Sequence, residues 1–248
     1  MSLHPIDESL FPVLKPYLSS SSIHRHRRRH VTLTYAQSID SKIAAGKGLR
    51  THISHEETKT MTHYIRSFHD SLVIGIGTLL ADNPSLNCRY GEGNRITPII
   101  IDPTFKSMEI FSKESKVEKY KLVENYLNGN GNKPVIVISD DIEVSDDRFN
   151  CDIVRIRRNN GDGKLSWESI LNQCEDQFGL HKFMIEGGAY IINDLLLCPD
   201  IVDSLIITIG PVFLGENGVS VSPKTPLSLK NVTWWKGISD SVMCSKLK

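Results

Sequence analysis

Short apolar runs of strand length recur along this chain and alternate with segments of helical character. Runs of this length suit fully buried strands, and such strands form mainly parallel sheets that helices cover on both faces. The runs are Val31–Ala36, Leu72–Ile76, Thr97–Ile101, Val135–Ser139, Asp152–Ile156, Lys182–Ile185 and Ser204–Ile209. This pattern predicts an α/β fold with a mostly parallel central sheet.

Three helices are expected between these strands. A capping box at Ser54–Glu57 opens a helix to about Ser67, with Met61, Ile65 and Phe68 facing the core. Ser166 caps a helix that ends at Phe178, before Gly179, and another helix follows from Ala189 to about Leu197. Lys116–Leu127 is also compatible with a helix.

The two ends of the chain differ in character. Val232–Gly237 and Val242–Leu247 are typical of an antiparallel hairpin that closes the sheet. Residues 1–30 contain several prolines and a serine run, so we expect a flexible arm ahead of a single domain at 31–248. The basic cluster His24–His30 favours a solvated arm, with a nucleic-acid patch as the alternative.

Composition narrows the class of protein. Lys and Arg together equal Asp and Glu, 29 against 29, so nothing global indicates nucleic acid or a membrane surface. No apolar run approaches the roughly 18 residues of a membrane span. The 5 cysteines are widely spaced without a Cys-x-x-Cys pair, which favours a reducing compartment, the cytoplasm, and argues against a metal site.

Two predicted strands each end in a glycine turn. An acidic residue follows the first turn, and another directly precedes the second. Gly75-Ile76-Gly77-Thr78 leads to Asp82-Asn83-Pro84, and Glu186 precedes Gly187-Gly188-Ala189. Ligands in open α/β sheets collect at the carboxyl ends of strands, and the second turn directly precedes a helix, whose free N–H groups suit a pyrophosphate. The two turns therefore predict a nucleotide site.

Familiar nucleotide and hydrolase motifs are missing. Leu80 stands where the third glycine of a Rossmann fingerprint is needed, and no Gly-x-x-x-x-Gly-Lys-Ser/Thr occurs. His55-Glu56 lacks the second histidine of a zinc protease, and there is no Gly-x-Ser-x-Gly elbow.

Several charged side chains are candidates for the site. Arg66 and Arg89 offer bidentate forks for a phosphate, although both, like Lys42, are equally compatible with solvated surface positions. Asp82 is a candidate acid or a turn residue. Glu186 needs a partner, because an acid at the end of a buried strand is otherwise costly.

Taken in order, these motifs resemble a known family. They are Ser38-Ile39-Asp40-Ser41-Lys42-Ile43-Ala44, Arg66, Gly75-x-Gly77-Thr78, Ala81-Asp82-Asn83-Pro84-x-Leu86-x-x-Arg89, Glu186-Gly187-Gly188 and Gly210-Pro211-Val212-Phe213-Leu214-Gly215. The set is similar to the riboflavin-biosynthesis reductases, the RibD C-terminal family of dihydrofolate-reductase-like fold. The similarity covers about residues 31–247.

The resemblance implies NADPH-dependent reduction of 2,5-diamino-6-ribosylamino-4(3H)-pyrimidinone 5′-phosphate to its ribitylamino form by a homodimer. It assigns the nicotinamide to Thr78 and Asp82, and gives further cofactor contacts to Ala36, Ser139, Leu165, Gly187, Gly188, Ala189 and Tyr190. It assigns the substrate to Lys42, Arg66, Leu86, Arg89 and Glu186. Bacterial relatives usually have glycine at the position of Ser41, which makes the placement of Lys42 an open question.

The expected chemistry is opening of the ribosylamine to an imine and hydride addition at C1′, with Asp82 or Glu186 assisting proton transfer. The sequence does not choose between the two carboxylates. No Pro-Cys-x-x-Cys deaminase motif is present. The alternatives are a same-fold reductase of the deaminated pyrimidine or a pterin-like compound, and a catalytically silent nucleotide-binding protein.

Overall fold

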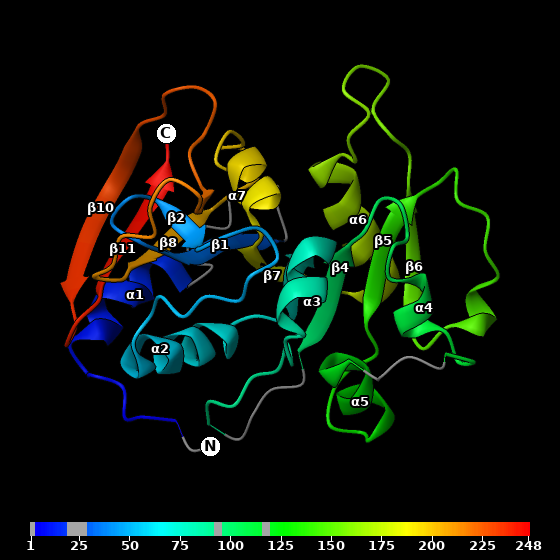
Figure 1. Cartoon of the computed structure of the whole chain (residues 1–248), viewed down its shortest axis with the longest axis horizontal. Helices are drawn as coiled ribbons and strands as arrows, with labels where there is room; N and C mark the ends of the chain where they lie inside the picture. Colours follow the sequence, from blue (N-terminus) through cyan, green and yellow to red (C-terminus); the bar gives the residue numbers. More distant parts are fainter. Residues whose placement is uncertain (1–2, 19–28, 92–95, 116–119) are drawn as a thin grey trace.

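A nine-stranded sheet forms the centre of the computed structural model (Figure 1), which describes residues 3–18, 29–91, 96–115 and 120–248. The strand order is β10-β11-β8-β1-β7-β3-β4-β5-β6. The strands are β1 (His30–Gln37), β3 (Ser71–Gly75), β4 (Thr97–Ile101), β5 (Val135–Ser139), β6 (Asp152–Ile156), β7 (Lys182–Gly187), β8 (Ser204–Ile209), β10 (Leu229–Lys236) and β11 (Ser241–Leu247). The seven runs predicted as buried strands all lie in this sheet.

Every pairing from β8 to β6 across the sheet is parallel, whereas β11 pairs antiparallel with both β8 and β10. The α/β class, the mostly parallel sheet and the C-terminal hairpin are therefore confirmed. In the middle of the sheet β3 and β7 are direct neighbours, with Ile74 opposite Gly187. This register puts the ends of the two strands side by side.

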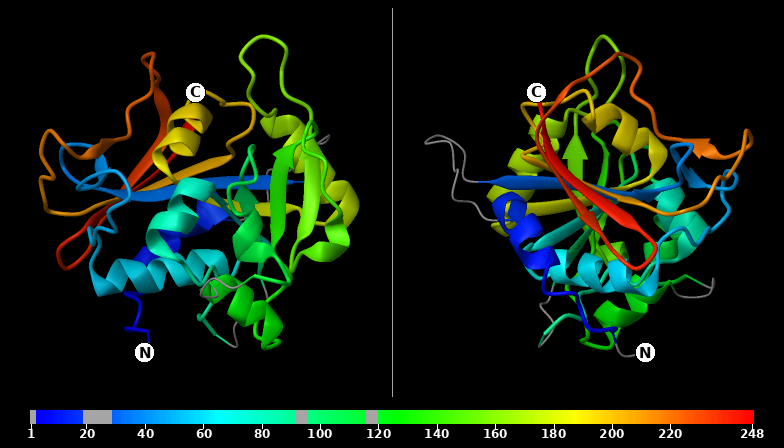
Figure 2. Two further views of the ribbon diagram at one scale, coloured as in Figure 1. Left: turned by 45° about the vertical axis from the view of Figure 1, so that its right-hand side comes forward. Right: turned by 90° about the vertical axis from the view of Figure 1, so that its left-hand side faces the viewer.

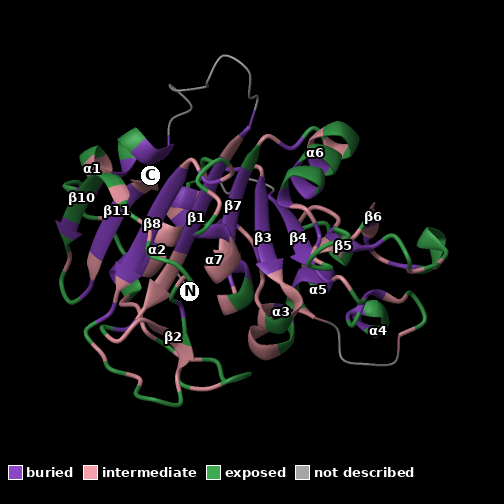
Figure 3. Ribbon diagram, turned by 90° about the horizontal axis from the view of Figure 1, so that it is seen from above, coloured by how far each residue is buried: buried purple, intermediate pink, exposed green. Residues whose placement is uncertain are grey.

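Helices cover both faces of the sheet (Figure 2). One core cluster packs α1 (Leu10–Leu18), α2 (Glu56–Arg66), α3 (Ile76–Asp82) and α5 (Lys121–Leu127) on one face. The other cluster packs α6 (Trp167–Phe178) and α7 (Ala189–Leu195) on the opposite face. Residues alternate along the central strands: Leu72 and Ile74 belong to the first cluster and Val73 to the second. The strands from β11 to β6 are therefore largely buried on both sides (Figure 3), whereas the edge strand β10 is largely exposed.

The N-terminal segment corrects one expectation. Residues 10–18 form helix α1, although Pro16 lies inside it. Leu10 and Leu14 are fully buried in the core, and the Tyr17 hydroxyl donates to the carbonyl of Asn231 on β10. The flexible arm predicted for residues 1–30 is therefore wrong over this helix, because burial of its apolar face offsets the hydrogen bond that the proline removes.

The basic cluster is described only at Arg29 and His30; its first five residues lie outside the described part of the chain. Arg29 is buried, contacts Glu168 at 2.6 Å and hydrogen-bonds Asn172 of α6. It is therefore part of the fold, not of a solvated arm.

Several local boundaries differ from the predicted ones. His55, not Ser54, is the N-cap of α2, and its ring accepts from the Glu57 amide. Phe68 is exposed, because the helix ends at Arg66 and the chain turns. Ile76 starts α3, so the first glycine turn is also a strand-to-helix junction. Short elements that were not predicted include β2 (Lys42–Ala44), which pairs with β9 (Val219–Ser220), α4 (Met108–Phe111) and the 3₁₀ helix η2 (Asp146–Arg148).

Candidate functional site

The two glycine turns lie next to each other at the carboxyl edge of the sheet. β3 ends at Gly75 and β7 ends at Gly187, and each strand leads directly into a short helix, α3 and α7. A side chain placed on Gly188 would have its Cβ 2.9 Å from the Thr78 hydroxyl oxygen. The first turn of each helix has backbone N–H groups without partners in the helix, so this is an edge where an anion or a nucleotide can be bound.

Glycine is required at the second turn. Gly187 has a φ of 113°, a conformation that other residues rarely adopt, and its missing Cβ would lie 2.9 Å from Ile192 Cδ1. At Gly188 the requirement is space beside Thr78. Gly187 therefore allows the backbone to turn over Ile192, and the missing side chain of Gly188 leaves a cradle beside Thr78 that a Cβ would fill.

Arg66 and Glu186 form an ion pair across the edge of the site. Arg66 Nε donates to Glu186 Oε1 and Arg66 Nη2 to Oε2, both at 2.7 Å, and Nη1 donates to the Asn87 carbonyl at 2.8 Å. The two side chains are 12% and 17% exposed. Glu186 thus has the partner that its buried position demands, and each nitrogen of the Arg66 guanidinium has an acceptor within the protein.

Arg89 is held differently. Its Nε and Nη2 lie 3.1 and 2.8 Å from His63 Nε2. His63 is buried on α2, and burial, together with the charges of Arg66 and Arg89, lowers its pKa to about 3. The imidazole is therefore neutral at physiological pH. Arg89 itself is exposed, and no carboxylate of the described residues lies within ion-pair distance of it.

Asp82 is half-buried at the end of α3. Burial raises its pKa, while Arg50 and His52, which face it from the loop before α2, act in the opposite direction. A carboxyl group whose pKa is raised retains a proton more readily at neutral pH. Asp82 is thus the better placed of the two predicted acids to exchange a proton, because Glu186 is occupied by Arg66.

The loop after β1 is fixed by Asp40. Its carboxylate accepts from the Leu214 and Gly215 amides at 3.0 and 2.8 Å, and the Ser38 hydroxyl, together with these amides, lowers its pKa to about 2. Ser41 has a φ of 57°, a left-handed conformation that glycine adopts without strain. Lys42 follows on β2, and among the described residues its ammonium forms no hydrogen bond or ion pair with another candidate.

The remaining cofactor candidates follow the same edge. Ala36 lies near the end of β1, which neighbours β7, whereas Ser139 ends β5, beyond β4. The structure thus separates Ser139 from the glycine turns by one strand. Leu165 precedes α6, and its neighbours Lys164 and Trp167 both hydrogen-bond Asp194 of α7, the helix that follows the second turn. Tyr190 is 68% exposed on the first turn of α7, with the Lys164 ammonium 5.5 Å from its ring centre.

Leu86 requires a correction. The residue is only 3% exposed, its side chain belongs to the core, and its φ is 44°. Leu86 therefore presents almost no surface to a ligand. Sequence reasoning also missed His63, Asn87, Arg50 and His52; the only signal was that His63 lies three residues before Arg66, on the same face of a helix.

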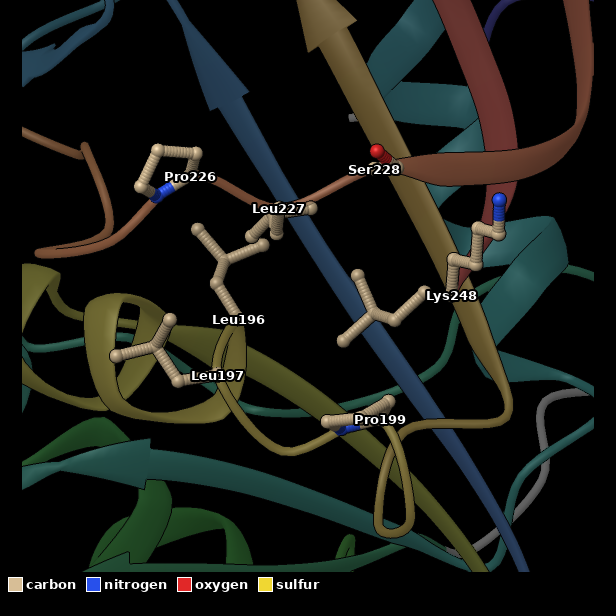
Figure 4. A pocket seen from close by; sticks show the side chains of 8 residues that line it. Leu196, Leu197, Pro199, Pro226, Leu227, Ser228 and Lys248 are labelled. Atoms are coloured by element: carbon tan, nitrogen blue, oxygen red, sulfur yellow. The ribbon is translucent and has the colours of Figure 1, made fainter.

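A separate pocket of about 350 Å³ lies between the end of α7 and the chain before β10 (Figure 4). Leu196, Pro199 and Leu227 line it together with Leu247. None of the predicted site residues lines it. Among the described residues no group of three or more His, Cys, Asp or Glu could hold a metal ion, and no described helix is long and apolar enough to cross a membrane.

Comparison with known proteins shows the family of the chain. The family model of the RibD C-terminal domain matches residues 29–243. The chain belongs to the RibD C-terminal domain family. Its relatives include the 2,5-diamino-6-ribosylamino-4(3H)-pyrimidinone 5′-phosphate reductases of Debaryomyces hansenii, 48% identical over 100% of both chains, and of Candida glabrata, 44% identical over 98% of both.

Solved structures of the RibD C-terminal family share the fold. The riboflavin biosynthesis reductase Rib7 of Saccharomyces cerevisiae is similar with a TM-score of 0.81 and 37% identity, over 97% of this chain and 100% of that one. The bifunctional deaminase/reductase of Thermotoga maritima matches with a TM-score of 0.66 and 22% identity, over 89% of this chain and 57% of its own. The second likeness concerns the fold alone.

Proposed function

We propose that this protein reduces 2,5-diamino-6-ribosylamino-4(3H)-pyrimidinone 5′-phosphate to the ribitylamino compound with NADPH, a step of riboflavin biosynthesis. One observation carries the proposal: the two glycine turns meet at neighbouring strand ends, with Glu186 directly before the second turn and Asp82 at the end of the short helix that follows the first. Full-length relatives named as reductases of this compound support it.

The residues at the edge fit a nicotinamide dinucleotide. Gly187, Gly188, Ala189 and Tyr190 would hold the pyrophosphate, since the cradle beside Thr78 leaves backbone accessible. Thr78 and Asp82 would border the nicotinamide, with Ala36 close by and Ser139 and Leu165 toward the adenosine. When bound, NADPH supplies the hydride for C1′ of the opened sugar.

The substrate side is proposed to contain Lys42, Arg89 and the Arg66–Glu186 pair. Of the two arginines, Arg89 is the phosphate ligand, because Glu186 already neutralises Arg66. Asp82, whose pKa is raised by burial, delivers the proton that the ring-opened nitrogen needs. Glu186 orients Arg66 and borders the sugar.

A homodimer in the cytoplasm completes the proposal. β10 is an edge strand of the sheet with exposed Val232 and Trp234, 42% and 58%, an apolar face that a second copy can cover. The 5 cysteines are all free thiols, as expected for a reducing compartment. Light scattering on the purified protein gives the mass; a monomer would contradict the dimer.

The test is turnover. Purified protein is mixed with NADPH and the synthetic pyrimidine, and NADPH absorbance and product mass are followed. We expect one NADPH consumed per ribitylamino product. Parallel reactions with the deaminated pyrimidine and with a pterin decide among substrates, and NADPH binding without oxidation of any of them would instead favour a silent binding protein.

A further inference from the structure

His63 lies between the two arginines of the site. It faces the 86–89 segment from α2, where its ring contacts the Arg89 guanidinium and its carbonyl accepts from Cys88 Sγ at 3.3 Å. One helical turn further on, Arg66 donates to Asn87 of the same segment. The end of α2 therefore fixes both the backbone that carries Arg89 and the direction of its side chain.

The two arginines differ in whether a neighbouring group neutralises their positive charge. Arg66 and Glu186 together are neutral, and both are largely buried. Arg89 is exposed, and its partner is an uncharged ring, because burial and the two guanidinium groups hold the His63 pKa at about 3. A carboxylate in place of His63 would hold the guanidinium equally well but would cancel its charge. An imidazole holds it and leaves the charge available.

We infer that His63 is a positioning residue for Arg89, which keeps the guanidinium directed at the substrate phosphate while leaving its positive charge free. This inference rests on the proposed function for the identity of the substrate. It adds a residue to which nothing in the sequence motifs assigned a role, and it explains why a buried histidine stands beside two cations.

Three variants separate holding from charge. His63→Leu removes the acceptor, His63→Gln keeps a neutral acceptor, and His63→Glu keeps an acceptor but adds a negative charge. Thr62→Ala is the matched control, since the Thr62 hydroxyl bonds the Thr58 carbonyl of the same helix at 3.0 Å. The measurements are kcat, KM for the phosphorylated pyrimidine, KM for NADPH, and the Kd of ribose 5-phosphate by calorimetry.

We expect His63→Leu and His63→Glu to raise both the pyrimidine KM and the ribose 5-phosphate Kd by about tenfold or more, since each loses a charge-assisted hydrogen bond to phosphate. In these two variants the NADPH KM should stay within about threefold of the wild-type value. All constants of His63→Gln should also stay within about threefold of the wild-type values. Thr62→Ala should behave as the wild type.

Three results would overturn the inference. The first is ribose 5-phosphate binding by His63→Glu as tight as in the wild type, and the second is no binding by the wild type at all. The third is an equal rise of both KM values in His63→Leu, the sign of a purely structural role. If the wild type binds ribose 5-phosphate with this variant pattern but does not reduce the pyrimidine, the inference stands and the proposed function fails.

Discussion

Replacing Glu186 by glutamine should destabilise the protein, because the buried charge of Arg66 loses its counter-charge. Glu186 accepts two hydrogen bonds of 2.7 Å from Arg66, and the two side chains are 17% and 12% exposed. Glutamine is nearly isosteric but neutral, so it can accept one of these bonds while its amide group opposes the other. Arg66 is then left largely buried without a counter-charge.

The size of the effect follows from this burial. Removing one partner of a fully buried pair costs about 3–5 kcal/mol; because water reaches part of this pair, we expect about 2–3 kcal/mol for Glu186→Gln. For a chain of this length that lowers Tm by roughly 4–12 °C. Adding Arg66→Met to Glu186→Gln should recover part of the loss, because the stranded charge is removed.

Urea and thermal unfolding measure both quantities. The matched control is Asp146→Asn, which breaks the surface pair between Asp146 and Arg155 and should change stability by less than about 1 kcal/mol. A loss for Glu186→Gln no larger than for Asp146→Asn would refute the reasoning, as would strictly additive losses in the double variant.

Three further outcomes are expected. Asp82→Asn should lower kcat by about 100-fold, and an unchanged kcat would contradict the acid role. Because burial raises the Asp82 pKa, the ionised carboxylate destabilises the folded protein only as pH rises through that pKa. The variant should therefore gain Tm over the wild type at pH 8 but not at pH 4. His69 is buried, and burial lowers its pKa to about 4, so the free energy of unfolding that is present above pH 6.5 falls as pH drops toward 4. His69→Gln should remove up to about 3 kcal/mol of that fall, measured by urea unfolding at the two pH values. An unchanged pH dependence in the variant would contradict this role of His69. Leu14→Ala should cost about 3 kcal/mol in urea unfolding, against less than about 0.5 kcal/mol for exposed Lys15→Ala; equal losses would mean that α1 is not docked.

The sequence predicts those parts of the fold that depend on local pattern. Thr97–Ile101, Val135–Ser139 and Ser204–Ile209 coincide with β4, β5 and β8, because a run of β-branched residues between turns has few alternatives. The Ser166 cap and the Gly179 stop of α6 are also confirmed, the glycine with a φ of 65°, since both act within one helical turn.

Features that depend on tertiary contact were not predictable. The prolines of α1 argue against a helix locally, and only the burial of Leu10 and Leu14 against the sheet reverses that preference. The ion pair of Arg66 joins residues 120 positions apart. No local rule selects Glu186 over a phosphate as its partner, and the same holds for Arg89 and His63.

The most direct measurement of the account is a crystal structure of the protein with NADPH bound. The account predicts the pyrophosphate against the amides of Gly187–Tyr190, the nicotinamide between Thr78 and Asp82, and Arg89 open toward the sugar side. A dinucleotide bound elsewhere, for instance in the pocket beside Leu196 and Leu227, would contradict it.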